Sequence, residues 1–316
     1  MAEIVLGLGA SHSPQVSMSW EQWPNMRRTE ERSPAIPANL TALLEPTMLA
    51  EHFGSVQQSV RTLAEVLQST QALDAIVIFG DDQHEQFDDT NMPAIAIYHG
   101  EQVPVTEPNR ATLPWTGPAE ARQHIGALAE KTHDVYPNAA GLAAHIVGAL
   151  TEQEFDITRC DKLRKAGIGH AFAFLYQRLW PECNVPIVPI MLNTYYPPNQ
   201  PTPRRSYALG AAVRKAIASW TGGSRVAVIA SGGLSHIVLD EPLDRAVLAG
   251  LRDHDPEQLY AVPRAKLRGG TSEILNWIAL GGAVGPMEMT LVDYVAGYRS
   301  EPSTGCGMAF AYWTPG

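Results

Sequence analysis

The sequence has few cysteines, no long apolar run and no excess of positive charge, and each absence excludes a class of protein. Its 316 residues include three widely spaced cysteines and no CxxC pair, which argues against a disulfide framework and a cysteine-bound zinc site. No stretch approaches the roughly 18 consecutive apolar residues typical of a membrane helix. The formal net charge of −10 disfavours a nucleic-acid partner, because phosphate binding requires clustered lysine and arginine.

The start of the chain also lacks the features of a secretory signal. Residues 1–9 carry no positively charged segment and are too short for the apolar part of a signal peptide, so we expect a first strand there. Together with the unpaired cysteines, this indicates a cytoplasmic protein with reduced thiols. Its 26 glycines and 24 prolines predict many turns and long loops.

Short β-branched apolar runs alternate with amphipathic stretches along the chain. The expected strands are residues 3–9, 74–80, 93–98, 154–158, 185–193 and 225–231, with a last strand near 306–313. The expected helices are residues 48–69, 118–132, 138–152, 170–180, 206–220, 241–253, 256–262 and 271–281. This alternation predicts an α/β fold with a mixed, mostly parallel central sheet covered by helices on both faces.

Three segments rich in proline resist assignment to helix or strand. They are residues 13–40, 99–117 and 194–205. Loops of this length in a compact domain often form the walls or lids of functional sites. No repeat or composition shift marks a boundary, so we expect a single domain over residues 1–316.

Five of the ten histidines follow strands or lie in short polar turns: His12, His84, His99, His170 and His236. Loops at the carboxyl ends of parallel strands meet at one edge of an open sheet, so these residues can converge there. Imidazole at such an edge suits divalent metal binding or proton transfer near neutral pH. The pattern therefore predicts an enzyme with a histidine-lined metal site. The other five histidines lie on expected helices or polar stretches, where structural or solvent-exposed roles are more ordinary.

Each motif also has a more ordinary explanation. A single histidine such as His12 is often a structural residue with satisfied hydrogen bonds, and Asp81–Glu85 has the composition of a solvated turn. Gly232 and Gly233 permit close approach of the backbone to a ligand. A phosphate-binding loop there is the rival interpretation, but the Walker lysine and a complete GxGxxG motif are both missing.

Glu273 begins an expected helix, where an acidic residue commonly caps the helix or interacts with its dipole. Trp277 lies four residues later on the same helical face, which indicates that Glu273 points into the interior. A buried carboxylate needs a cation or hydrogen bonds, because an unpaired buried charge is very costly. A metal ion would meet that need.

Hydrolysis by a serine nucleophile is a weaker interpretation. Residues 233–236 lack the second glycine of a GxSxG motif, and no cysteine is flanked like a catalytic nucleophile. Two histidines and one carboxylate with open positions suit non-haem Fe(II) acting on dioxygen. That arrangement leaves His236 or His170 available for acid–base work.

Several ordered motifs together are specific. They are Ser11-His12, Asp82-Gln83-His84-Glu85, Gly169-His170-Ala171, Asn193-Thr194-Tyr195-Tyr196, Gly232-Gly233-Leu234-Ser235-His236 and Gly270-Thr271-Ser272-Glu273. In this set the chain resembles, over nearly its whole length, the class III extradiol ring-cleavage dioxygenases of the protocatechuate 4,5-dioxygenase β-subunit superfamily. The likeness is strongest to single-chain members of the 3-O-methylgallate dioxygenase type.

This resemblance implies an Fe(II) site held by two histidines and one glutamate. His12 matches the first histidine and Glu273 the glutamate, whereas His236 matches the catalytic base and His170 a histidine near the substrate. The chain departs from the pattern at the second histidine. Gln83 occupies its register and His84 follows one residue later, so Gln83, His84, or His52 from a neighbouring helix can supply the remaining ligand.

The resemblance further implies Fe(II)-dependent extradiol cleavage of a catecholic or gallate-type aromatic acid with O2. Tyr195 and Tyr196 are expected in the pocket wall. Arg204 or Arg205 is a candidate for a substrate carboxylate, although a solvated basic pair is the more ordinary explanation. We expect a homo-oligomer, a dimer, with no nucleic-acid or membrane partner. The alternatives are a metal-binding or zinc-hydrolase protein on the same scaffold without ring cleavage and, more weakly, a phosphate-binding hydrolase.

Overall fold

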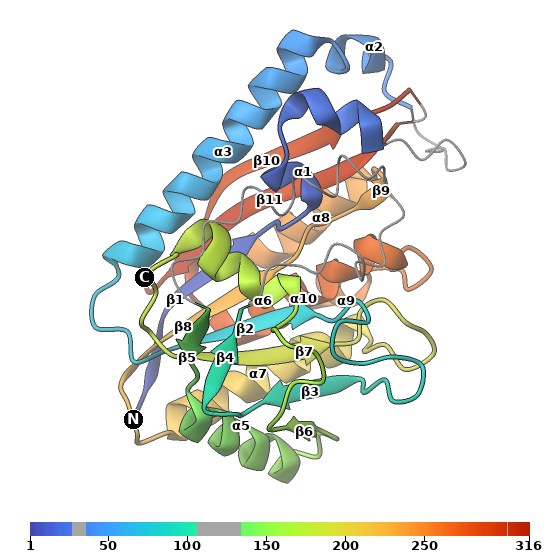
Figure 1. Ribbon diagram of the computed structural model, residues 1–316. Helices are drawn as coiled ribbons and strands as arrows, with labels where there is room; N and C mark the ends of the chain where they lie inside the picture. Colours follow the sequence, from blue (N-terminus) through green and yellow to red (C-terminus); the bar gives the residue numbers. More distant parts are fainter. Residues whose placement is uncertain (27–35, 106–133, 302) are drawn as a thin grey trace.

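The computed structural model describes residues 1–26, 36–105, 134–301 and 303–316 (Figure 1). Its centre is a nine-stranded sheet in the order β10-β11-β1-β8-β2-β7-β3-β6, with β9 paired to β11. These strands are β1 (Glu3–Ala10), β2 (Ala75–Asp81), β3 (Ile95–Tyr98), β6 (Thr158–Cys160), β7 (Ile187–Leu192), β8 (Arg225–Ser231), β9 (His236–Val238), β10 (Glu288–Tyr298) and β11 (Thr304–Thr314). A separate two-stranded sheet joins β4 (Gln102–Pro104) to β5 (Val135–Pro137).

The middle of the large sheet is parallel, and antiparallel strands flank it. β1, β8, β2 and β7 are parallel neighbours, whereas β11 runs antiparallel to β1 and β3 runs antiparallel to β7. The parallel strands are almost wholly buried, as expected for strands covered on both faces. Their carboxyl ends lie at one edge of the sheet, so the loops that follow them meet there.

Helices cover both faces and enclose two apolar cores. One core contains residues from η1 (Trp20–Met26), α3 (Pro46–Ser69), α6 (His170–Phe174) and the π-helical turn η2 (Leu175–Leu179). The other contains residues from α5 (Ala140–Glu152), α7 (Pro203–Ser219), α8 (Glu241–Arg252), α9 (Pro256–Tyr260) and α10 (Ile274–Val284). The short elements α1 (Pro14–Ser17), α2 (Leu40–Leu43) and η3 (Gly269–Glu273) complete the described structure. Figure 1 shows α3 running along β10 and β11.

The α/β fold and the mixed sheet covered on both faces are confirmed. The expected strand at 154–158 is wrong over most of its length, because this segment begins with the turn that follows α5: Glu154 has a φ of 62°, and the Phe155 N–H donates to the carbonyl of Leu150. The sequence analysis also missed β10, whose mixture of exposed and half-buried residues contains no continuous apolar run. The expected helix at 118–132 and much of the loops at 13–40 and 99–117 lie outside the described residues. No described helix is both long and apolar enough to span a membrane.

Glycines allow α7 and α10 to pack against each other almost backbone to backbone. A Cβ added to Gly210 would lie 1.8 Å from the carbonyl oxygen of Ala279, and one added to Gly282 would lie 2.0 Å from that of Tyr207. Only glycine fits at such distances. This contact sets the position of α10, which begins directly after Glu273.

We therefore expect Gly210→Ala to destabilise the protein by roughly 1–3 kcal/mol or more, because the added methyl group must push the two helices apart. Gly148→Ala in α5 is the matched control. A Cβ there meets nothing within 4 Å, and replacing a helical glycine with alanine typically stabilises by about 0.4–1 kcal/mol. Urea denaturation of both variants measures the difference; equal midpoints would contradict the close helix contact.

Candidate functional site

Five ionisable side chains gather at the carboxyl edge of the sheet: His12, Asp81, His170, His236 and Glu273. Each comes from a different segment, namely the loop after β1, the last residue of β2, the first residue of α6, the first residue of β9 and the last residue of η3. Neighbouring strands explain the convergence, because β1 and β8 end side by side with Ala10 paired to Ser231. We call these five residues the edge cluster.

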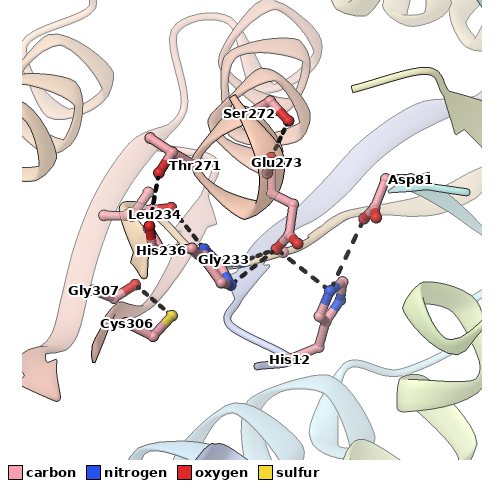
Figure 2. A network of polar contacts seen from close by, with 12 residues as sticks. His12, Asp81, Gly233, Leu234, His236, Thr271, Ser272, Glu273, Cys306 and Gly307 are labelled. Atoms are coloured by element: carbon pink, nitrogen blue, oxygen red, sulfur yellow. Dashed lines mark hydrogen bonds and ion pairs between the residues drawn. The ribbon is translucent and has the colours of Figure 1, made fainter. Parts of the chain in front are cut away.

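Glu273 lies between two imidazoles (Figure 2). Its Oε2 atom is 3.4 Å from Nε2 of His12 and 3.6 Å from Nε2 of His236. The same Nε2 atom of His12 is also 3.9 Å from Oδ1 of Asp81 and 3.2 Å from Nε2 of His170. The side chains of His12, Asp81 and Glu273 are all almost completely buried.

The neighbouring imidazoles and several hydrogen bonds favour the ionised form of the Glu273 carboxylate. Its Oε2 accepts the backbone N–H of Gly233 at 2.7 Å, and its Oε1 accepts the hydroxyl of Tyr195 at 2.9 Å. Burial raises the pKa of Glu273, but the charges of His236 and His12 and the Gly233 hydrogen bond outweigh it, so the net shift is downward. The pKa of Asp81 is raised, first by burial and then by the negative charge of Glu273.

The ring of His236 is fixed between two backbone segments. A Cβ on Gly233 would lie 2.3 Å from its Cε1 atom, and a Cβ on Gly270 would lie 2.5 Å from its Cγ atom. Its Nδ1–H donates to the carbonyl of Leu234 at 2.9 Å, which leaves Nε2 facing Glu273. Burial opposes protonation of His236, but the electrostatic effects of Cys306 and Glu273 raise its pKa to about 10.

His170 is anchored by Glu85. Both carboxylate oxygens of Glu85 lie 3.0 Å from Nδ1 of His170, and its Oε1 also accepts the His170 backbone N–H at 2.7 Å. Burial opposes the charged form, but the Glu85 carboxylate raises the pKa of His170 to about 10.

A cavity of about 790 Å³ opens beside His236. Its apolar wall includes Ile237, Val238 and Leu239, and two basic side chains, Lys266 and Arg268, lie along it. Lys266 is paired with Asp240 at 2.6 Å. The guanidinium group of Arg268 makes no hydrogen bond or ion pair with another residue that the structure describes, so it is available to an anionic ligand.

Within the edge cluster, His12, Asp81 and His170 each offer a donor atom within 4.8 Å of the other two, an arrangement that fits a divalent metal ion. Imidazole nitrogens and carboxylate oxygens bind such ions at roughly 2.0–2.2 Å, which places neighbouring ligand atoms about 3 Å apart. The separations of 3.2 and 3.4 Å from His12 to His170 and Glu273 are close to that value. Two histidines with carboxylates are also a donor set that suits Fe(II).

Comparison with known proteins then identifies the family. The profile of the catalytic LigB subunit of aromatic ring-opening dioxygenase matches residues 34–300. The chain belongs to this family. A gallate dioxygenase from Pseudomonas putida is 33% identical over 159 residues, which cover 46% of this chain and 45% of that protein. The match thus spans less than half of that relative's length.

A solved structure shows the same overall fold. An uncharacterized protein from Escherichia coli K12 superposes with a TM-score of 0.50 at 14% sequence identity. The alignment covers 97% of this chain and 99% of the other. At this identity the likeness concerns the fold alone.

In this LigB-family chain, the structure brings together His12, His170, His236 and Glu273, and it places Gln83 and Tyr195 against them. His84 points elsewhere: its ring stacks on Tyr196 at 3.8 Å, and its Nε2 lies 3.6 Å from Asp89. His52, on α3, makes no hydrogen bond or ion pair with the described residues of the cluster. His99 also lies outside the cluster and forms no such contact with it.

Arg204, expected at a substrate carboxylate, lies outside the site. Its guanidinium group is 3.6 Å from Glu257 and stacks over the ring of Tyr260 at 4.3 Å. Arg205 instead stacks over Phe155 at 3.9 Å. Both contacts are typical of a basic pair at the start of a surface helix.

The sequence analysis missed four residues of the site: Asp81, Glu85, Arg268 and Cys306. A signal existed for two of them, because Asp81, Gln83 and Glu85 alternate along one segment and their side chains share a side. Cys306 is brought to His236 only by the pairing of β9 with β11. No local pattern singles out Arg268.

The turn that carries His236 in this LigB-family site depends on Asp244. This fully buried carboxyl accepts the Ser235 N–H at 2.8 Å, the Ser235 hydroxyl at 2.7 Å and the Tyr294 hydroxyl at 2.7 Å. Burial raises its pKa to about 6, against these hydrogen bonds.

Asp244→Ala should lower the free energy of unfolding by roughly 2–4 kcal/mol, because it leaves buried donors on Ser235 and Tyr294 without an acceptor. Asp253→Ala removes a solvent-exposed acid at the end of the same helix and should not move the denaturation midpoint measurably. Chemical denaturation tests both. A small effect at Asp244 would show that water replaces its hydrogen bonds.

Proposed function

We propose that this protein is an Fe(II)-dependent extradiol dioxygenase that opens the ring of a catecholic aromatic acid with O2. Family membership establishes ring-opening dioxygenase chemistry at the level of the family. The observation that supports the finer assignment is the placement of His236. Its Nε2, the ring nitrogen left free by the Leu234 bond, faces the same carboxylate that His12 faces, so a proton acceptor adjoins the metal-binding atoms.

His12 and Glu273 would hold the iron. When bound, Fe(II) supplies a positively charged centre that brings the two substrate hydroxyls and O2 together and lowers the pKa of the hydroxyls. Because Glu273 contributes to the raised pKa of His236, engagement of Glu273 by a cation would lower that pKa toward the neutral range in which general bases work best.

His236 is the proposed acid–base residue. Its Nδ1–H is committed to the Leu234 carbonyl, so Nε2 takes a substrate hydroxyl proton and later returns it. The flanking Gly233 and Gly270 prevent the ring from turning, which keeps Nε2 directed at the site. The Tyr195 hydroxyl, hydrogen-bonded to Oε1 of Glu273, orients the carboxylate, and the Tyr196 ring lies beside that of Tyr195.

The cavity beside His236 suits the aromatic ring, and Arg268 suits the acid group. Its apolar wall can cover a ring, whereas a guanidinium group binds a carboxylate through paired hydrogen bonds. This assignment replaces Arg204, whose charge is engaged by Glu257. The substrate class is therefore a diol that carries a carboxylate.

Oxygen uptake tests the proposed function. Protein loaded anaerobically with Fe(II) is mixed with gallate, protocatechuate and hydroxypyridone diols, and each diol is matched with a methyl ether that leaves no adjacent pair of free hydroxyls, such as the 4-O-methyl ether of gallate. We expect uptake with at least one diol and none with its blocked ether. Tight zinc occupancy together with no uptake from any diol would instead support a metal-binding or zinc-hydrolase role.

His236→Ala should retain iron but lower kcat by roughly 10²–10⁴-fold, the usual contribution of a positioned acid–base group. His145→Ala is the control, since His145 bonds Ala216 and Ser219 on the helical face away from the site. Metal content and steady-state oxygen uptake are measured for both. Normal turnover in His236→Ala would rule out the base assignment.

Arg268→Gln should raise KM for a carboxylated diol by roughly 10-fold or more, because a charge-assisted pair is lost. Its KM for unsubstituted catechol should stay the same, since catechol carries no carboxylate. Arg264→Gln, four residues earlier on the exposed surface, controls for the change in net charge. Equal effects on both substrates would contradict a carboxylate contact at Arg268.

A further inference from the structure

The second imidazole ligand is the position at which the sequence leaves three candidates open. We propose that His170, oriented by Glu85, is this ligand, and that Gln83, His84 and His52 are not. The inference rests on the proposed metal dependence and identifies which side chains of this chain provide it. Five features of the site support it: the direction of His84, the neighbours of Gln83, the anchoring of His170, the close approach of His170 to His12 and the space at Gly169.

The loop geometry turns His84 away from the edge cluster. Its φ is 58°, and its ring lies flat on Tyr196 with ring centroids 3.8 Å apart and planes 3° from parallel. Its Nε2 atom lies near the exposed carboxylate of Asp89. To reach His12, the ring would have to give up this stacking and the backbone turn that supports it.

Gln83 lies at the cluster as a hydrogen-bond donor. Its Nε2 atom is 3.1 Å from Oδ2 of Asp81 and 3.4 Å from Oε1 of Glu273. Turning the amide over would place its carbonyl oxygen against these two carboxyl groups, one of which is ionised. The neighbours therefore favour the N–H₂ group facing inward, and a protonated amide nitrogen is not a metal ligand.

His170 has the arrangement expected of a metal-bound histidine. The carboxylate of Glu85 can only accept hydrogen bonds, so Nδ1 of His170 is the protonated nitrogen and Nε2 is the atom directed into the site. Histidines that bind metals characteristically donate their other ring N–H to a carboxylate or carbonyl, which fixes the ring orientation. Glu85 performs that role for His170.

A proton or a cation must lie between the facing Nε2 atoms of His12 and His170. Nε2 of His170 lies 3.2 Å from Nε2 of His12, whose Nδ1 is in turn bonded to the hydroxyl of Ser231 at 2.9 Å. Two nitrogen lone pairs at this distance repel each other unless a proton or a cation lies between them. His12, Asp81 and His170 each offer an atom within 4.8 Å of the other two, so one ion can engage all three.

The carboxylate of Glu85 fits against the backbone at residue 169 only because that residue is glycine. A Cβ on Gly169 would lie 2.6 Å from Oε2 of Glu85. This close approach lets the same carboxylate bind both the backbone N–H and the ring of His170. Gly169→Ala therefore displaces Glu85 without altering any metal-binding atom.

The test counts imidazoles on bound metal without using turnover. Wild-type protein loaded with one equivalent of Cu(II) should show two coordinated imidazoles by pulsed EPR, and His170→Gln should show one. His84→Gln and Gln83→Ala should both retain two. Circular dichroism and thermal melts establish that each variant is folded.

The positioning role of Glu85 has its own readout. Co(II) affinity measured by calorimetry should fall by roughly 10–100-fold in Glu85→Gln and in Gly169→Ala, the usual effect of removing a partner that orients a ligand. Both variants should still show two imidazoles with Cu(II), since His170 itself is present. Unchanged Co(II) affinity in both would contradict a positioning role for Glu85.

Two results would overturn the ligand assignment: two coordinated imidazoles in folded His170→Gln, or the loss of one in His84→Gln or Gln83→Ala. These outcomes are separate from a failure of the proposed function. A wild-type protein that binds metal through two imidazoles but consumes no oxygen with any diol would refute ring opening and leave the role of His170 intact.

Discussion

The burial of the Glu273 carboxylate is the constraint on which the rest of the site depends. An ionised carboxylate away from water costs several kcal/mol unless it is paired and hydrogen-bonded. Here the carboxylate accepts the N–H of Gly233 after β8 and the hydroxyl of Tyr195 after β7. It also faces two imidazoles, one after β1 and one at the start of β9. No local segment can provide these partners. The charge is stable only when the whole carboxyl edge of the sheet has assembled, which ties formation of the site to formation of the fold.

Much of this arrangement can be predicted from the sequence, because strands and helices leave periodic patterns of apolar residues. The apolar runs locate the parallel strands, and Trp277 four residues after Glu273 correctly indicates that the carboxylate faces inward. The strand β10 could not be found this way, since an edge strand needs only partial burial and carries no continuous apolar run. Cys306 reaches His236 only through strand pairing between distant segments, and no local pattern encodes that contact.

The segment after β2 shows the boundary between what a pattern can and cannot predict. Alternate residues of an extended chain share a side, which correctly indicates that Gln83 and His84 diverge. It does not say which of them faces inward. The choice is made by the positive φ of His84 and the Tyr196 ring that receives it, both of which depend on packing with the loop after β7. His84 and Tyr196 lie far apart in the sequence, so no rule based on local spacing links the two rings.

The side chains of this segment explain how the site can do without a histidine at position 83. Asp81, Gln83 and Glu85 all face the edge cluster, so one short segment contributes a carboxyl group, an amide donor and the anchor of His170. The amide bridges Asp81 and Glu273, two acidic groups that would otherwise repel each other. Histidine at 83 could donate to only one of them through a single ring nitrogen while binding metal with the other. Glutamine at position 83 is therefore consistent with the proposal that the loop orients the ligands and that α6 provides the second imidazole.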